Sequence, residues 1–365
     1  MKKIGILTMH KVQNYGSALQ AFALLHTLEK LQTDSILIDY KFPNSTKRSI
    51  RTSIRRFLIN LLSGFIFTKQ KNRFQRFYQT YFKCTSKIYN TPEELQKGKF
   101  DFDIYMTGSD QVWNPRYVKD DTSFLFSFAK KDATKIAYAA SFATTEIPPH
   151  LKDKYSELLS KYKAISVREQ SGITLTESLT GKKAELVCDP TLLLTKEEWS
   201  ELAVRVPQRI KEPYILAYIL TYAYNPYPEI DNIINEIQNK LNLKLVILNG
   251  SLKDLKRKNS IVIKDAGPLE FLSLIKNASF IITTSFHGTA FALNFEKPFY
   301  SVIKSFDNTD SRMLSLLEHV GAKNRAIVYN KETDYNFEID FKDISKKLDA
   351  FRDTSFKFLQ SNIND

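Results

Sequence analysis

Residues 3–40 read KIGILTMHKVQNYGSALQAFALLHTLEKLQTDSILIDY, and they predict one complete strand–helix–strand unit. The apolar run at 3–9 has the length of one strand. Apolar residues then recur at three- and four-residue spacing through 16–31, as they do on the buried face of a helix. A second apolar run at 35–40 predicts the next strand. Two strands joined through a helix lie parallel, so this stretch indicates an α/β fold with a parallel sheet.

The same alternation continues along the first half of the chain. Further strands are expected at 102–108, 134–141, 164–169 and 184–190, with a helix at about 150–161. The charged, proline-containing stretch TKEEWSELAVRVPQRIKEP (195–213) then interrupts the pattern. We interpret it as a connection between two domains, because domain boundaries often fall in polar stretches of this type.

A second series of patterns follows the connection. Strands are expected at 214–220, 244–249 and 280–285, and helices at about 226–241, 267–278, 287–295, 312–320 and 341–361. The two series predict two Rossmann-like domains, spanning 1–200 and 210–335, that face each other across a cleft. The C-terminal helix within 340–365 is expected to pack back on the N-terminal domain. In such folds ligands bind beyond the carboxyl ends of the strands.

The composition is that of a soluble globular chain, with 43% hydrophobic and 25% charged residues. The N-terminus has no signal-peptide pattern, and the longest apolar patch, 57–67, falls short of the roughly 20 residues that span a bilayer. Cys84 and Cys188 show no metal-type spacing and no reason to form a disulfide. We therefore expect a cytoplasmic protein, free or peripheral at the inner membrane face.

Almost all of the net charge of +13 comes from one segment. Residues 41–92 contain twelve Lys or Arg and no Asp or Glu, and removing them leaves a net charge of +1. Apolar residues are interleaved with these cations, mainly at 57–67. Such a segment suits an anionic membrane surface or a lipid-pyrophosphate substrate. Nucleic acid is the competing polyanion, and a solvated helical insertion without a partner is the third interpretation.

Polar residues follow two of the predicted N-terminal strands. In MHKVQNYGSALQ (9–20), Gly16 at a helix start offers free backbone N–H groups to an anion or hydroxyl, although a plain helix cap explains it equally well. In TGSDQVWN (107–114), Asp110 can accept hydrogen bonds from sugar hydroxyls and Trp113 can stack on a sugar face. The alternative for the second segment is an Asx turn beneath a core tryptophan.

Two further strand ends carry a cation and a histidine. Arg168 ends the apolar strand in AISVREQSG (164–172), where it either clamps a carboxylate or phosphate or pairs with the neighbouring Glu169. His287 follows the apolar strand in TTSFHGTAFALN (283–294), next to Gly288, which lets a backbone approach a ligand. A lone histidine is often structural, but its ordinary pKa near 6.5 also suits proton transfer around neutrality.

These segments together resemble a known family. The motifs ILTMHKVQNYGSALQAFAL, DIYMTGSDQVWNP, YAASFA, ISVREQSGITLT, VCDPTLLL and TTSFHGTAFALNFEKPF occur in the order seen in bacterial polysaccharide pyruvyl transferases. The resemblance runs from residue 3 to about 328, and the GSDQVWN and SFHG segments are its most specific parts. It implies a glycosyltransferase-B-like fold and transfer of pyruvate from phosphoenolpyruvate to two hydroxyls of one sugar, with formation of a cyclic ketal and release of phosphate.

On the donor side, the resemblance implies that His287 is the general acid that protonates carbon 3 of the enolpyruvyl group. It implies that Arg168 binds the donor, with Ser285 and Gly288 beside it. Arg312 is a second candidate for the donor's anionic groups. No cofactor and no metal are expected.

On the acceptor side, Asp110 is expected to face the sugar, either as a base or only to position it. Asn14 and Gly16 would shape this side, and Trp113 would contact the sugar. We expect the acceptor to be undecaprenyl-pyrophosphate-linked, with peripheral contact to an anionic membrane through 47–76 and no nucleic-acid partner. The acceptor sugar, galactose or N-acetylmannosamine, stays open.

Two alternatives remain. One is a nucleotide-sugar-dependent glycosyltransferase of the same fold, for which Glu270 is the only obvious ribose contact. The other is a non-catalytic carbohydrate- or polyanion-binding protein, which would leave His287 without a task.

Overall fold

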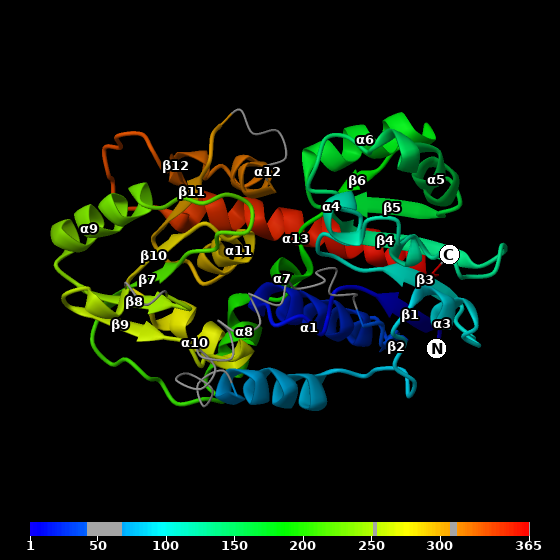
Figure 1. Ribbon diagram of the computed structural model, residues 1–365, viewed down its shortest axis with the longest axis horizontal. Helices are drawn as coiled ribbons and strands as arrows, with labels where there is room; N and C mark the ends of the chain where they lie inside the picture. Colours follow the sequence, from blue (N-terminus) through cyan, green and yellow to red (C-terminus); the bar gives the residue numbers. More distant parts are fainter. Residues whose placement is uncertain (42–67, 251–253, 307–311, 365) are drawn as a thin grey trace, which may run out of the picture.

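The computed structural model describes residues 1–41, 68–250, 254–306 and 312–364. In this part of the chain, two six-stranded sheets lie side by side, each flanked by helices (Figure 1). All the strand pairs recorded within them are parallel. The central strands are buried on both faces, which explains why they stand out in the sequence as continuous apolar runs.

The first sheet is built by the N-terminal half of the chain in the order β2-β1-β3-β4-β5-β6. Its strands are β1 (Lys3–Leu7), β2 (Asp34–Leu37), β3 (Ile104–Thr107), β4 (Thr134–Ala140), β5 (Ala164–Val167) and β6 (Glu185–Leu186). The strand order reverses between β1 and β3, and ligands bind at such a switch point in open parallel sheets.

The second sheet has the order β12-β11-β10-β7-β8-β9. Its strands are β7 (Tyr214–Tyr218), β8 (Lys244–Leu248), β9 (Ser260–Ile263), β10 (Phe280–Thr283), β11 (Phe299–Ile303) and β12 (Ala326–Val328). Its switch point lies between β7 and β10. Three of its strands, β9, β11 and β12, were not predicted. β9 and β12 are short strands at the sheet edges, whereas β11 is a buried strand of five residues.

The helices include α1 (Tyr15–Lys30), α3 (Pro92–Gln96), α4 (Pro115–Val118), α5 (Pro149–Leu159), α6 (Gln170–Thr180), α7 (Pro190–Leu193), α8 (Lys196–Ala203), α9 (Glu229–Leu241), α10 (Pro268–Asn277), α11 (Phe286–Asn294), α12 (Arg312–His319) and α13 (Phe341–Asn364). Seven of these helices, α1, α5 and α9 to α13, were predicted from the periodic patterns, whereas α3, α4, α6, α7 and α8 were not. No helix in the described part of the chain is long and apolar enough to cross a membrane.

The predicted connection at 195–213 is more than a linker. Its first part forms α8, which begins with a capping box at Thr195. Trp199 on α8 is fully buried, and its ring lies against Phe22 of α1 and Phe291 of α11. Although the stretch is rich in charged residues, one face of α8 is buried against both halves of the chain. The connection therefore also holds the two halves together.

Helix α13 runs from beside the second sheet to the first one, and the C-terminus lies near β3 and β4 (Figure 1). The hydroxyl of Ser355 on α13 accepts a 2.8 Å hydrogen bond from the backbone N–H of Cys188. Phe358 packs near Tyr138 of β4, and Lys2 donates to the carbonyl of Ile363. The last helix therefore contacts the N-terminal half directly.

The basic segment is described only in part, because residues 42–67 lie outside the described residues. Residues 68–81 form a helix below α1 in Figure 1, and one of its ends reaches α10. Arg73 on this helix pairs with Asp265 and Glu270 of the second half at 2.8 Å each. Arg73 is therefore paired within the protein. Most of the stretch 47–76 lies outside the described residues, so the membrane contact expected through it stays a prediction.

Candidate active site

Five strand ends meet where the two sheets face each other. They are the loop after β1, the loop after β3, the end of β5, the segment after β6 and the start of α11 after β10. The carboxyl ends of parallel strands lie at one edge of a sheet, so polar residues that follow different strands come together there. This cluster contains Asp110, Arg168, Asp189 and His287.

Arg168 is the centre of the cluster, and its side chain is completely buried. Its Nη1 lies 2.6 Å from Oδ2 of Asp189, and its Nη2 lies 3.4 Å from Oδ1 of Asp110. The guanidinium also stacks on Phe286, 4.6 Å from the ring centre. Glu169, the expected alternative partner, instead accepts the backbone N–H of Phe142. Both terminal nitrogens of Arg168 thus contact carboxylates, while its Nε has no hydrogen-bond partner within the described residues. The donor-binding role of Arg168 stays a prediction.

Asp189 is the functional candidate that the sequence did not single out. It lies beyond β6 as the N-cap of α7, where it accepts the backbone N–H of Thr191 at 3.0 Å. Ser109 donates to its second oxygen at 2.8 Å. Burial alone raises the pKa of Asp189, but Arg168, His287 and Thr191 outweigh this effect and lower it to about 2. One feature of the sequence could have pointed to Asp189. Arg168 at the end of a buried strand requires an acidic partner, and Asp189 follows the next strand along the chain.

His287 lies in the first turn of α11, close to the start of the helix expected at 287–295. Only 7% of the residue is exposed, and its Nε2 lies 3.8 Å from Oδ2 of Asp189. Nε2 has no hydrogen-bond partner within the described residues. Burial is the main cause that lowers the pKa of His287 below 6.5, and the positive charges of Arg168 and Arg312 add to it. The imidazole is therefore mainly neutral at pH 7.

Asp110 forms the other acidic wall of the cluster. Ser17 of α1 donates to its carboxylate, and the backbone N–H of Gln111 donates to it at 2.9 Å. Its φ of 77° lies in the left-handed region, which aspartate tolerates better than most residues. Burial raises the pKa of Asp110, but Arg168, His287 and Ser17 together lower it below its ordinary value. Asp110 is therefore ionised at neutral pH.

Gly16 brings the two halves into contact at this point. It lies in the first turn of α1, and a Cβ at this position would lie 1.9 Å from Nδ1 of His287. The three atoms nearest to that Cβ all belong to the imidazole. A residue larger than glycine cannot occupy the position unless His287 or α1 moves.

We expect Gly16→Ala to lower the free energy of unfolding by about 1–3 kcal/mol, the usual cost of overpacking. His287→Ala removes the overlapping ring, and alanine is otherwise preferred to glycine within helices. Adding Gly16→Ala to a His287→Ala background should therefore be neutral or stabilising. Chemical denaturation of the four proteins in this cycle measures both effects. An equal cost in the two backgrounds would mean that the clash involves other atoms.

Three other predicted residues have local structural roles. The side chain of Asn14 caps α1 by accepting the backbone N–H of Ser17, and Ser285 caps α11 in the same way through Gly288. A Cβ at Gly288 would lie 2.4 Å from Oγ1 of Thr283, so glycine lets α11 pack closely on β10. These residues place His287 and the N-terminus of α1.

Trp113 does not contact a ligand, and this prediction is corrected. Its side chain is fully buried, and its Nε1 donates to the carbonyl of Phe124 at 3.1 Å. Both of its ring neighbours, Phe142 and Tyr162, are also buried. No face of the indole is left for a sugar, so the core tryptophan is the correct interpretation.

A cleft of about 420 Å³ opens beside the cluster. Gln111 and Phe286, the chain neighbours of Asp110 and His287, form part of its wall. Three cations also line it, Arg116, Lys304 and Arg312, and no Asp or Glu does so among the described lining residues. Tyr117 and Tyr222 lie in the same wall and are 36% and 51% exposed. The cleft suits an anionic ligand that also carries an apolar or sugar face.

In the described part of the chain, no group of three or more His, Cys, Asp or Glu residues is placed to hold a metal ion. Glu270, the ribose candidate, pairs with Arg73 and also accepts the backbone N–H of Gly267 at 2.9 Å. Its carboxylate is therefore engaged within the protein.

Solved structures with this architecture share little sequence with the chain. The chain is similar to UDP-GlcNAc 2-epimerase from Methanocaldococcus jannaschii, with 15% identity, a TM-score of 0.54, and coverage of 96% of this chain and 92% of that chain. It is also similar to UDP-GlcNAc 2-epimerase from Neisseria meningitidis bound to UDP-GlcNAc, with 12% identity, a TM-score of 0.53, and coverage of 98% and 93%. These likenesses concern the fold alone, and they confirm the predicted pair of Rossmann-like domains in a glycosyltransferase-B-like arrangement.

No curated protein matches the chain. The family model for polysaccharide pyruvyl transferases, in contrast, matches residues 14–304. This range begins at the cap of α1 and includes Asp110, Arg168, Asp189 and His287. The predicted family is thus confirmed, and the chain belongs to the polysaccharide pyruvyl transferases.

Proposed function

We propose that this protein transfers pyruvate from phosphoenolpyruvate to two hydroxyls of one sugar, forming a cyclic ketal and releasing phosphate. The observation that carries the proposal is the position of His287. Its Nε2 makes no hydrogen bond within the described structure and lies 3.8 Å from Oδ2 of Asp189, and its chain neighbour Phe286 lines a cleft together with three cations. That arrangement combines a proton donor with a site for a carboxylate and a phosphate.

The reaction needs one proton at carbon 3 of the enolpyruvyl group, and His287 supplies it in this proposal. Carbon 2 then becomes electrophilic, and one sugar hydroxyl attacks it and loses its proton. The second hydroxyl displaces phosphate from carbon 2 and also loses its proton. One of these two protons restores His287 and the other leaves with phosphate, so protons and charges balance.

The donor's anionic groups are held by Arg312, Arg116 and Lys304 in the cleft. Arg312 is also close enough to affect the pKa of His287. Arg168 acts from behind His287, where it fixes Asp189 and Asp110 and supplies a buried positive charge. Fixed cations aimed at a reacting anion are typically the largest single contribution to catalysis.

Donor binding also charges His287. In the free protein, burial and two arginines hold the pKa of the imidazole below 6.5. A bound carboxylate and phosphate offset those positive charges, so the pKa of His287 rises in the complex. His287 is thus protonated mainly when the donor is bound. Without the donor, burying the positively charged imidazolium would be unfavourable.

Asp110 orients the attacking sugar hydroxyl in this proposal. Its lowered pKa makes it a weak base but keeps it a charged acceptor of hydrogen bonds. The stacking role expected of Trp113 passes to Tyr117 and Tyr222, which are exposed in the cleft. The acceptor is a sugar of a polysaccharide precursor, in keeping with the family.

Phosphate release from phosphoenolpyruvate tests the function. We expect release that requires an acceptor, assayed with galactose- and N-acetylmannosamine-terminated oligosaccharides, and a product whose mass increases by one ketal-linked pyruvate. Thermal shift with phosphoenolpyruvate, and with UDP and GDP sugars, supplies an independent measure of binding. Stabilisation by a sugar nucleotide and not by phosphoenolpyruvate would replace the proposal with the glycosyltransferase alternative.

A further inference from the structure

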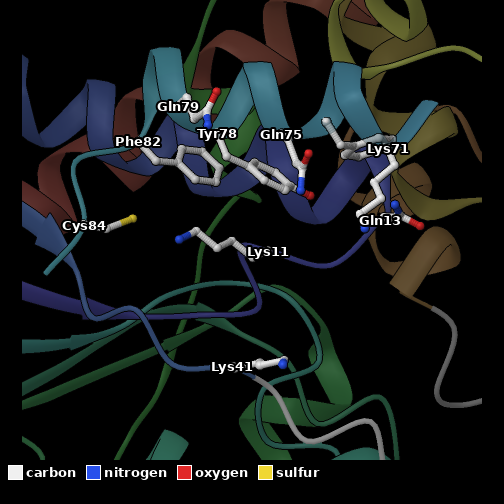
Figure 2. A pocket seen from close by; sticks show the side chains of 10 residues that line it. Lys11, Gln13, Lys41, Lys71, Gln75, Tyr78, Gln79, Phe82 and Cys84 are labelled. Carbon is white, nitrogen blue, oxygen red and sulfur yellow. The ribbon is translucent and has the colours of Figure 1, made fainter. Parts of the chain in front are cut away.

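A second pocket, of about 690 Å³, lies beside the loop after β1. One wall is the helix at 68–81, and the other is the loop itself with the edge of the sheet (Figure 2). Its lining residues are Lys11, Gln13, Lys41, Lys71, Phe74, Gln75, Tyr78, Gln79, Phe82 and Cys84. None of the roles given above to the active-site residues involves this pocket.

The walls of this pocket are fixed by contacts on both sides. The hydroxyl of Tyr78 donates to the carbonyl of Val12 at 2.8 Å, which joins the helix to the loop. The rings of Tyr78 and Phe82 stack with centres 5.2 Å apart. At the other end of the helix, Gln70 donates to the hydroxyl of Tyr15 at 3.0 Å. The pocket is therefore preformed in the described structure.

The pocket carries a net positive charge. Lys11 pairs with Asp39, and no ion pair is recorded for Lys41 or Lys71 with any described residue. No Asp or Glu is among the described lining residues. Burial raises the pKa of the Cys84 thiol to about 11, so it adds no negative charge at neutral pH. Two lysines with no recorded ion pair thus face the same space.

The other lining residues are mainly glutamines and aromatic residues, which are side chains suited to binding sugars. Glutamine side chains both donate and accept hydrogen bonds, as hydroxyl-rich ligands require. Figure 2 shows the rings of Tyr78 and Phe82 and the side chain of Gln75 turned from the helix towards Lys11. Lys71 lies beside Gln13, and Lys41 approaches from the opposite side. Lysines, amides and aromatic faces in one pocket suit a saccharide that carries an anionic group.

The pocket is also near the active site. Gln13 lines it, and Gly16, three residues later, contacts His287. Three residues of chain span at most about 11 Å.

We propose that this pocket binds a phosphate-bearing sugar of the acceptor, at the opposite end from the sugar that receives pyruvate. This inference rests on the proposed function, because it assumes a saccharide acceptor at the active site. Lys41 and Lys71 contact the phosphate groups, the glutamines contact hydroxyls, and Tyr78 and Phe82 cover the sugar face. The pocket then selects charged acceptors and holds them in register with His287.

The test compares one oligosaccharide in two forms, as an alkyl diphosphate and as an uncharged alkyl glycoside. Inorganic diphosphate is the third probe. Calorimetry gives the dissociation constants without need for turnover, and phosphate release gives the acceptor KM. The variant is Lys41→Gln/Lys71→Gln, and the matched control is Lys152→Gln/Lys357→Gln, two exposed lysines for which no ion pair is recorded.

We expect the wild-type protein to prefer the diphosphate form, and the variant to lose roughly ten- to a hundredfold in affinity for it. Affinity for the uncharged glycoside and the KM for phosphoenolpyruvate should not change, and the control should behave as wild type. An equal loss for both forms, or no loss, would overturn the proposal. So would inorganic diphosphate binding as tightly as the glycosyl diphosphate. If phosphoenolpyruvate releases no phosphate, the proposed function fails. The calorimetric measurements still decide whether the pocket binds the glycosyl diphosphate.

Discussion

His287→Ala should reduce acceptor-dependent phosphate release by about 10²–10⁴-fold, the usual contribution of a positioned general acid. The loss should fall on kcat, because the cations that bind the donor in the cleft remain in place. The variant should fold, since removing the ring leaves space beside Gly16 rather than a clash. Initial rates at saturating phosphoenolpyruvate, with circular dichroism as a fold check, measure the effect.

His150→Ala is the matched control, because that imidazole is exposed on α5, 69% in its side chain. It should leave kcat and KM unchanged. If release survives in His287→Ala at a rate within about threefold of the wild-type rate, far less than an acid contributes, His287 is structural and another group protonates carbon 3.

The pH dependence gives a second signature of the same role. The proton must be on His287, so activity falls as the pH rises through its pKa. In kcat/KM the relevant pKa is that of the free protein, which burial lowers below 6.5. In kcat it is that of the donor complex, which the bound anions raise. We therefore expect the alkaline limb of kcat to lie at higher pH than that of kcat/KM, and both limbs to vanish in His287→Ala.

Asp189→Ala should lower the free energy of unfolding by about 3 kcal/mol, because it leaves the buried Arg168 without its closest partner. The 3.4 Å contact with Asp110 compensates only part of that charge. Activity should fall as well, since Nε2 of His287 faces the same carboxylate. Urea denaturation and phosphate release report the two effects separately.

The double variant Asp189→Ala/Arg168→Met separates charge compensation from catalysis. Methionine replaces the arginine with an apolar side chain of similar length and so removes the uncompensated positive charge. Much of the lost free energy of unfolding should therefore return. Activity should not return, because the field around His287 is still absent. Asp353→Ala, at an exposed position of α13, is the control and should change neither quantity. A double variant no more stable than Asp189→Ala would show that the ion pair is not the source of the loss.

Predictions from the sequence were accurate for most central strands and for the longest helices, although β11 and α6 were not predicted. Strands buried on both faces produce continuous apolar runs, and amphipathic helices produce a regular spacing, so both parallel sheets and most helices follow from neighbouring residues alone. Asp110, Arg168 and His287 were found for the same reason, since each lies just beyond such a run. The edge strand β9 was missed because it is short and partly exposed, and β12 because it has only three residues. The buried strand β11 was also missed.

Tertiary structure alone decided which side chains meet and which are buried. Nothing local distinguishes an exposed Trp113 from a core one, because its burial depends on Phe142 and Tyr162. Arg168 finds Asp189 only when β5 and β6 pair, and Gly16 meets His287 only when the two halves close. The sequence thus determined the fold and the strand ends that bear the chemistry. Long-range packing determined the ion pairs, the buried imidazole and the cationic cleft, because burial and charge compensation depend on neighbours far away in the chain.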